Sequence, residues 1–298
     1  MKMYKRMKRS YALYFTSLMI LFSSMITTCA IAQCSDAGIC SIENQLRDRW
    51  RHSIMLTYLY GKSGSNADST QGGLTFQTLM LSGEVQLFTG TSIWASLPLN
   101  QQSGPLGTVT GIGDLIVIVN QKLLSIGGAE LSVGAGGRFA TASVNSNNLP
   151  QSYQSGLGSN DLILQADIIS KSINVGIGYQ LVGGRSLNKI TQLKRGDNFI
   201  IRGGYTYRAE HFDLGGELLA IKQIQESTVI NPVAQSSEFV AVNGSDQFQI
   251  NILLKARYSF NDTFGLTGTV GIPLLKREVN FDGLTRAFSA SVGVAIDL

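Results

Sequence analysis

The stretch Arg286-Ala-Phe-Ser-Ala-Ser-Val-Gly-Val-Ala-Ile-Asp-Leu298 decides the fold. Every second residue from Phe288 onward is apolar, and the residues between are small or polar: Phe288, Ala290, Val292, Val294, Ile296 and Leu298 alternate with Ser289, Ser291, Gly293, Ala295 and Asp297. This alternation is the period of a β-strand with one apolar and one polar face. We therefore expect a barrel that closes when this last strand pairs with the first.

Composition narrows the class of protein. The chain has 298 residues, with 33 glycines, 5 prolines and 15% charged residues. This length suits one barrel of ordinary size. Beyond the N-terminus, no apolar run reaches the about 20 residues that a membrane-spanning helix needs, which argues against a helical inner-membrane bundle.

Residues 1–32 have the pattern of a secretory signal peptide. Five basic residues precede a largely apolar run, and Ala30-Ile31-Ala32 is a small-x-small cleavage site. The alternative is an uncleaved anchor helix. Removing five basic residues from 24 leaves 19 against 20 acidic residues, a net charge of −1. The basic character therefore belongs to the signal and gives no reason to expect nucleic acid as a partner.

Residues 33–49 form a predicted periplasmic segment before the barrel, which occupies residues 50–298. Cys29 falls within the signal, so Cys34 and Cys40 remain in the mature chain. Two cysteines in an exported protein favour a disulfide. A metal site and a redox dithiol are weaker alternatives, because two sulfurs are half a zinc shell and the spacing is not that of a redox motif. We expect no metal and no cofactor.

Alternation with period two predicts an all-β, antiparallel, up-and-down transmembrane barrel of twelve strands. The expected strands cover residues 50–60, 75–88, 93–99, 111–124, 129–141, 161–168, 173–181, 199–208, 212–220, 248–260, 264–272 and 288–298. Pro98 is expected near the end of the third strand, where a missing N–H is tolerable.

The predicted connections alternate between long and short. Long loops cover residues 61–74, 100–110, 142–158, 184–197, 225–246 and 275–286, and tight turns join the other strand ends. This sorting is typical of an outer-membrane barrel with both termini in the periplasm. Aromatic residues gather near both ends of the strands, for example Phe88, Phe212 and Phe260 on one side and Tyr58, Phe139 and Phe248 on the other. Two such girdles fit the two membrane interfaces.

The polar face of the strands carries charges that predict a lumen lining. These residues are Glu84, Asp114, Lys122, Glu130, Arg138, Asp161, Asp167, Arg202, Arg208, Asp213, Glu217, Lys255 and Arg257. One interpretation is a neutralised lumen, in which Asp213 and Glu217 pair with Arg202, Arg208, Lys255 and Arg257 on the neighbouring strands. The other is a selectivity lining for a small solute, whose mixed signs predict no strong preference for anions or cations.

Catalysis is not expected, and we assign no catalytic residues. One outer-membrane phospholipase family uses a twelve-stranded barrel with a Ser/His pair, which needs a histidine within reach of a serine. This chain has only His52 and His211. Ser53 directly follows His52, so their side chains point to opposite faces of a strand.

The segment Gly111-Ile-Gly-Asp-Leu115 opens a strand in the middle of the expected barrel. It resembles the transporter-like outer-membrane proteins grouped with phenol-degradation pathways. The segment from Cys34 to Cys40 resembles transporter barrels of Bacteroidetes-type outer membranes. The resemblance implies an outer-membrane barrel that passes hydrophobic or aromatic small molecules. Leu298 departs from the Phe or Trp that most often ends such barrels.

These observations predict a monomeric, integral outer-membrane protein of a Gram-negative cell. We expect a passive channel or transporter for small molecules, with outer-membrane lipid and the barrel-assembly machinery as partners. The alternative is a structural or interaction barrel with a closed lumen, whose long loops or N-terminal segment bind a partner. The occupancy of the lumen discriminates between the two.

Overall fold

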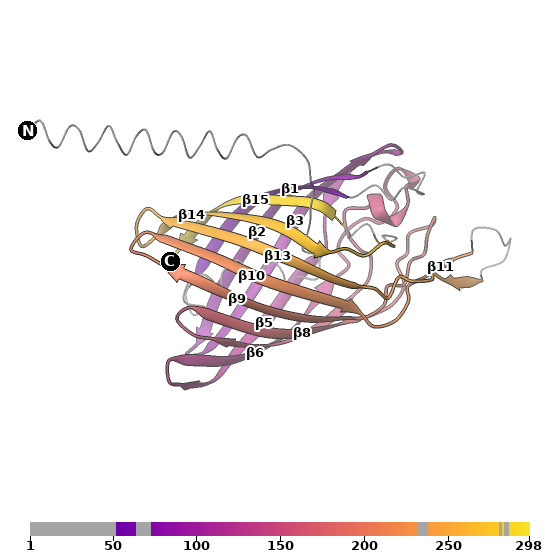
Figure 1. Cartoon of the computed structure of the whole chain (residues 1–298). Coiled ribbons are helices and arrows are strands. Elements are labelled where there is room, and N and C mark those ends of the chain that lie inside the picture. Colours follow the sequence, from indigo (N-terminus) through magenta and orange to yellow (C-terminus); the bar gives the residue numbers. More distant parts are fainter. Residues whose placement is uncertain (1–51, 64–72, 232–237, 280–281, 283–285) are drawn as a thin grey trace, which may run out of the picture. The chain divides into compact units, whose positions relative to one another are not determined.

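The chain forms a closed antiparallel β-barrel of twelve strands (Figure 1). The computed structural model describes residues 52–63, 73–231, 238–279, 282 and 286–298, the residues 286–288 by their backbone only. The predicted signal peptide, the segment 33–49 and Cys34 and Cys40 lie outside the described residues, so the expectations about them stay predictions.

Each barrel strand pairs with its neighbours in sequence, and the first and last strands close the ring. The twelve barrel strands consist of thirteen segments, because β4 and β5 together make one strand. The segments are β1 (Ser53–Ser63), β2 (Thr75–Phe88), β3 (Thr91–Gly104), β4 (Gly107–Ile112), β5 (Leu115–Ile126), β6 (Ala129–Phe139), β7 (Asp161–Ile169), β8 (Ile173–Val182), β9 (Asn198–Arg208), β10 (Phe212–Gln223), β13 (Phe248–Ser259), β14 (Phe264–Leu275) and β15 (Arg286–Asp297). Ser53 lies opposite Asp297 and Tyr60 opposite Ala290. The alternating stretch at 286–298 therefore forms the closing strand that its period predicts.

The prediction of a loop at 100–110 was wrong. β3 continues to Gly104, a turn follows, and β4 begins at Gly107. This hairpin has polar residues on both faces, as in the hydrogen bond from Gln101 Nε2 to Thr110 Oγ1 at 3.0 Å. It therefore shows no apolar alternation from which a strand could be predicted.

The fourth barrel strand is broken in the middle, which the sequence analysis did not predict. β3 pairs with β5 up to Ser96 and with β4 from Leu99 onward, so β4 and β5 together make one strand of the barrel. Pro98 lies opposite this break and within β3, not near its end. Its carbonyl accepts a hydrogen bond from Gly113 N at 2.7 Å. A proline fits here because the ladder has no partner strand at the break.

The remaining boundaries agree with the alternation to within a few residues. β1 begins at Ser53 and extends to Ser63, three residues beyond the predicted end. The long connection at 225–246 contains a small hairpin of β11 (Thr228–Ile230) and β12 (Phe239–Ala241). Helical structure in the described residues is limited to the 3₁₀ turns η3 (Ser146–Asn148) and η4 (Gln151–Tyr153), and none is long enough to cross a membrane.

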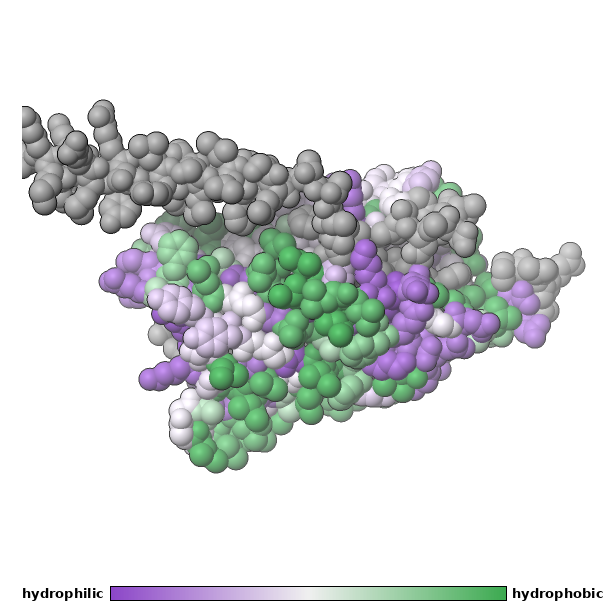
Figure 2. Space-filling view, viewed as in Figure 1, coloured by the Kyte–Doolittle hydropathy of each residue, from purple (hydrophilic) through white to green (hydrophobic). Residues whose placement is uncertain are grey.

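The outer face of the barrel is apolar. Val292 is 50% exposed and Leu254 is 47% exposed, although both are large hydrophobic residues. Figure 2 shows hydrophobic atoms gathered over the side of the strands and hydrophilic atoms toward the end that carries β11. Phe212, Tyr258 and Phe260 cluster at the end with short turns, with ring centroids 4.8 and 5.0 Å apart. This is the surface that lipid covers in transmembrane barrels.

Substitutions on the closing strand β15 and on β13 test which face meets lipid. Val292→Arg and Leu254→Arg should each cost about 2–4 kcal/mol of stability in a bilayer, because the charge faces lipid. Ser291→Arg, on the inner face of β15 next to Val292, is the matched control and should cost less. Heat-modifiable gel migration and urea unfolding in vesicles measure the difference. Equal stability of the three variants would contradict the assigned faces.

Candidate functional site: the barrel lumen

Buried ion pairs line the inner wall toward the end with short turns. Arg202 binds Asp167, and Lys255 Nζ lies 3.0 Å from Glu217 Oε2. Both side chains of each pair are at least nine-tenths buried. Charges shut away from water persist only when they are paired, so these contacts neutralise the wall.

Glycines on intervening strands make room for these contacts. Asp167, Gly176 and Arg202 lie in register on β7, β8 and β9, and the ion pair passes over the glycine. A Cβ on Gly176 would overlap Asp167 Oδ1 and lie 2.6 Å from Arg202 Nε. Asn174 reaches Glu217 over Gly204 in the same way, with a hydrogen bond of 3.1 Å. A residue without a side chain is thus required between two partners on alternate strands.

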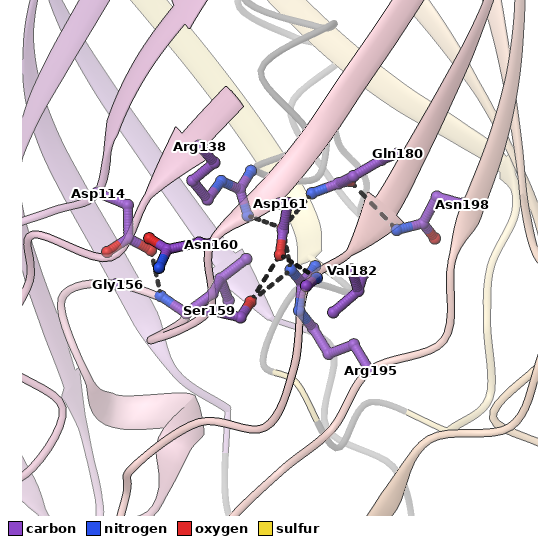
Figure 3. Close-up of polar contacts among 12 residues, drawn as sticks. Asp114, Arg138, Gly156, Ser159, Asn160, Asp161, Gln180, Val182, Arg195 and Asn198 are labelled. Carbon is purple, nitrogen blue, oxygen red and sulfur yellow. Dashed lines mark hydrogen bonds and ion pairs between the residues drawn. The ribbon is translucent and has the colours of Figure 1, made fainter. Parts of the chain in front are cut away.

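A second polar cluster surrounds Asp161 at the end of the barrel with long loops (Figure 3). Asp161 Oδ2 accepts hydrogen bonds from Arg195 Nη2 and from Gln180 Nε2, both at 2.6 Å. Ser159 Oγ donates to Asp161 Oδ1 at 2.8 Å, and Arg138 Nη1 lies 3.8 Å from Oδ2. Arg195 belongs to the loop at 183–197, so this cluster fastens that loop to the barrel wall.

Asp114 fastens the neighbouring loop. It lies in the break between β4 and β5, and its carboxylate accepts hydrogen bonds from Leu157 N at 2.6 Å and Ala142 N at 3.3 Å. Tyr153, also from this loop, is fully buried against the inward side chains of Phe76 on β2 and Val109 on β4. The loop at 140–160 therefore packs on the inner surface at this end of the barrel.

The loops on this side are also bonded to each other. Ser186 Oγ donates to Gln151 Oε1 at 2.5 Å, and Asn188 Nδ2 donates to Val144 O at 2.6 Å, which joins the loops at 140–160 and 183–197. Arg185 continues the network to β11 through Thr228 O at 3.1 Å. The mouth of the barrel on this side carries one connected set of loops.

An apolar band interrupts the polar inner wall. It consists of buried side chains that contact one another on β3, β5, β7, β9, β10 and β13: Trp94, Ile116, Ile118, Ile163, Ile200, Leu219, Ile221 and Leu253. Gly136 lies between Ile118 and Ile163 in register, and a Cβ at this position would overlap the carbonyl oxygen of Val117. The sequence analysis did not identify this band, because its members lie in continuously apolar runs such as 115–119 that have no clear period.

The predicted lumen residues fall into three groups. Arg138, Asp161, Asp167, Arg202, Glu217, Lys255 and Arg257 are buried on the inner wall, as are Asp114 in the strand break and Glu84, which accepts from Ser92 Oγ at 2.5 Å. Lys122 and Glu130 form a half-exposed ion pair near the short turn after β5. Asp213 lies opposite Arg208 in register, and Arg208 is exposed at the rim. Whether they contact a solute stays a prediction.

The expected pairing is confirmed for one contact, since Glu217 binds Lys255. Two further contacts lie outside the expected scheme: Arg202 binds Asp167 across β8, and Arg257 Nη2 binds Asp297 Oδ2 at 2.8 Å. The analysis considered only adjacent strands, whereas a glycine on the middle strand brings alternate strands together.

Arg195 is a functional candidate that the sequence analysis missed. It lies in a polar loop with no period, so no pattern singled it out. Arg277, which lies 3.3 Å from Asp282 and donates to Gln223 Oε1 at 2.9 Å, was missed for the same reason. A periodicity argument identifies strand faces only.

Both histidines lie at the end with short turns. His52 Nδ1 accepts a hydrogen bond from Gln86 N at 3.3 Å, and the ring of His211 lies 6.3 Å from that of Tyr258. Over the described ranges, no three His, Cys, Asp or Glu side chains gather as a metal site.

Comparison with known proteins supports the fold. No family model and no curated protein matches the chain. The NanC porin has a TM-score of 0.51 at 15% identity, with 82% of this chain and 100% of that chain covered. The translocator domain of autotransporter NalP from Neisseria meningitidis has a TM-score of 0.49 at 10% identity, with 88% of this chain and 94% of that chain covered. The Salmonella typhi outer membrane phospholipase has a TM-score of 0.44 at 13% identity, with 86% of this chain and 97% of that chain covered. The likeness to the NanC porin, together with the closed barrel described above, shows the fold of outer-membrane β-barrels.

Glycine substitutions test the bridging contacts. Gly176→Ala should cost about 1–3 kcal/mol, because the new methyl group displaces the Asp167–Arg202 pair. Gly203→Ala is the matched control, because nothing lies within 4 Å of its added Cβ. Urea unfolding in vesicles measures both. If the two variants unfold at the same urea concentration, Gly176 is not needed to make room for the Asp167–Arg202 pair.

Removal of the Asp161 carboxylate tests the cluster that holds the loop. Asp161→Asn should cost about 3 kcal/mol or more, because Arg138 and Arg195 lose a buried counter-charge. Asp246→Asn is the control, since the Lys222–Asp246 pair is about 40% exposed and should contribute about 0–1 kcal/mol. Limited proteolysis of the loop at 183–197 and urea unfolding report the difference. Equal protease resistance of Asp161→Asn and the unsubstituted protein would contradict the fastening role.

Proposed function

We propose that this chain is an integral outer-membrane barrel that passes small molecules through its lumen. The polarity of the closed barrel carries this proposal. Large apolar residues such as Leu254 face outward, and ion pairs such as Lys255–Glu217 face inward. A soluble barrel buries its apolar face inside, so this inverted arrangement suits a membrane.

The charges of the lumen suit uncharged solutes better than one sign of ion. Acidic and basic side chains pair within the wall, as in Arg202–Asp167 and Arg257–Asp297. A wall of neutralised pairs offers hydrogen bonds but little net field along the path. We therefore propose passive passage of small uncharged molecules, with no strong preference between anions and cations.

Membership of the transporter-like family associated with phenol degradation is part of this proposal. The segment Gly111–Leu115 that suggests it is the break between β4 and β5, where Asp114 holds Leu157 N. The glycines and the aspartate of this motif thus have a physical role here, which is to seat the loop at 140–160. Monomeric assembly through the barrel-assembly machinery, with both termini in the periplasm, is proposed on the same basis.

A second candidate is a barrel with a closed lumen whose loops bind a partner. The bonded loops favour it, because Tyr153 and Asn188 are fully buried on that side. In this case the loops form a fixed surface, and no solute passes.

Liposome swelling with the purified barrel discriminates between the two candidates. Uncharged sugars of increasing size should enter vesicles that contain the barrel, at rates that fall with solute size. Vesicles that contain the Arg195→Gln variant should swell faster, because this substitution removes the ion pair that holds the loop at 183–197 to Asp161. Lys222→Gln, at the half-exposed pair, is the control and should swell as the unsubstituted protein does. Swelling at the rate of empty vesicles for all three proteins would support the closed barrel.

A further inference from the structure

The outer wall of β1 to β4 changes from apolar to polar toward the long loops. Three rows of outward side chains cross these strands in register. The last largely apolar row consists of side chains that are at least 42% exposed: Tyr58, Leu79, Leu99 and Ile112. In the two rows beyond it every side chain has a hydroxyl, amide or amine group: Tyr60, Gln77, Gln101 and Thr110, then Lys62, Thr75, Ser103 and Thr108. These eight residues form the polar panel.

Hydrogen bonds order the side chains of the polar panel. Tyr58 Oη donates to Gln77 Oε1 at 2.9 Å, and Gln77 Nε2 donates to Gln101 Oε1 at 3.2 Å. Gln101 Nε2 then donates to Thr110 Oγ1 at 3.0 Å. Each amide retains a second N–H and a second lone pair, and the Thr110 hydroxyl retains its own proton. The polar panel therefore presents fixed donors and acceptors to whatever lies outside the barrel.

Other strands end differently on the same side of the barrel. Toward the long loops, the outward residues of β6, β9 and β13 are the exposed aromatic residues Phe139, Phe199 and Phe248. Aromatic side chains are the usual residues at a membrane interface. Over β2 to β4 they are replaced by amides and hydroxyls, so this part of the wall suits a polar neighbour.

The free edge of β4 indicates the level at which the polar panel lies. The carbonyls of Thr108 and Ile112 point away from β3, and Asn147 Nδ2 and Ser155 Oγ donate to them at 2.9 and 3.0 Å. Thr110 lies between them, so the period of two points its backbone N–H and C=O the same way. No residue of the described ranges bonds to these two groups. Unpaired backbone groups are not tolerated in hydrocarbon, which places the polar panel among lipid headgroups.

We propose that the polar panel binds the sugar headgroup of a membrane lipid, whose acyl chains lie against the apolar row next to it. The two surfaces are continuous, because Gln77 and Leu79 lie two residues apart on the outer face of β2. Sugar hydroxyls both donate and accept hydrogen bonds, as the amides and hydroxyls of the polar panel do. Lys62 is the one charged residue among the eight, so the surface offers little to a zwitterionic headgroup. This inference concerns the outer wall and does not depend on passage through the lumen.

Lipid retention by the detergent-purified barrel, measured by native mass spectrometry, tests the proposal. The probes are digalactosyl diacylglycerol and phosphatidylcholine with the same acyl chains, at equal concentration. The unsubstituted barrel should retain the galactolipid about tenfold better, because only its headgroup matches the donors and acceptors of the polar panel.

Two variants remove this preference to different extents. The double variant Gln77→Leu, Gln101→Leu should retain the two lipids equally, because both amides are lost. Thr110→Val keeps the shape of the side chain and should lower the preference about threefold, because one hydroxyl is lost. Gln121→Leu is the matched control: Gln121 is also an exposed glutamine on the outer face, but it lies toward the short turns. This control should keep the full preference.

The outcomes decide the proposal without reference to solute flux. Equal retention of the two lipids by the unsubstituted barrel would overturn it, and so would an unchanged preference in either variant once heat-modifiable gel migration shows that variant to be assembled. Loss of the preference in Gln121→Leu would also overturn it, because the headgroup would not be bound at the polar panel. If vesicle swelling is absent while the galactolipid preference follows the polar panel, the proposed function fails and this inference is supported.

Discussion

The structure depends on one constraint, which is that every charge on the inner wall must find its partner within a low-dielectric space. Adjacent strands supply some partners, as in Glu217 and Lys255. Others come from alternate strands, and then the middle strand must carry a glycine, as Gly176 does between Asp167 and Arg202. The high glycine content therefore serves the lumen as much as the turns.

The same constraint organises the loop side of the barrel. Asp114 and Asp161 lie where barrel strands begin, and the carboxylate of each accepts a hydrogen bond from a loop residue. Because both are buried, the loops that satisfy them become part of the inner wall and not free connections above it. The loops, the ionic regions and the apolar band then form successive layers along one lumen, and the chemistry of each layer is fixed by a few side chains.

The outer face of this barrel could be predicted from the sequence because lipid imposes a strict period on it. Val292 and Leu254 face outward as the alternation requires. The β3–β4 hairpin could not be predicted in this way, because both of its faces are polar. The apolar band and Arg195 were missed because neither produces a period: the band lies in continuous apolar runs, and Arg195 acts from a loop.

The seam between β1 and β15 has a consequence for the order of events during folding. Ser53 pairs with Asp297, whereas every other pair of neighbouring barrel strands is also consecutive along the chain. Consecutive hairpins close short loops and form early, while this pairing joins distant parts of the chain and carries the largest entropic cost of closure. We therefore expect the seam to form last, and until it does the partly folded sheet exposes two unpaired edges that can pair with other chains.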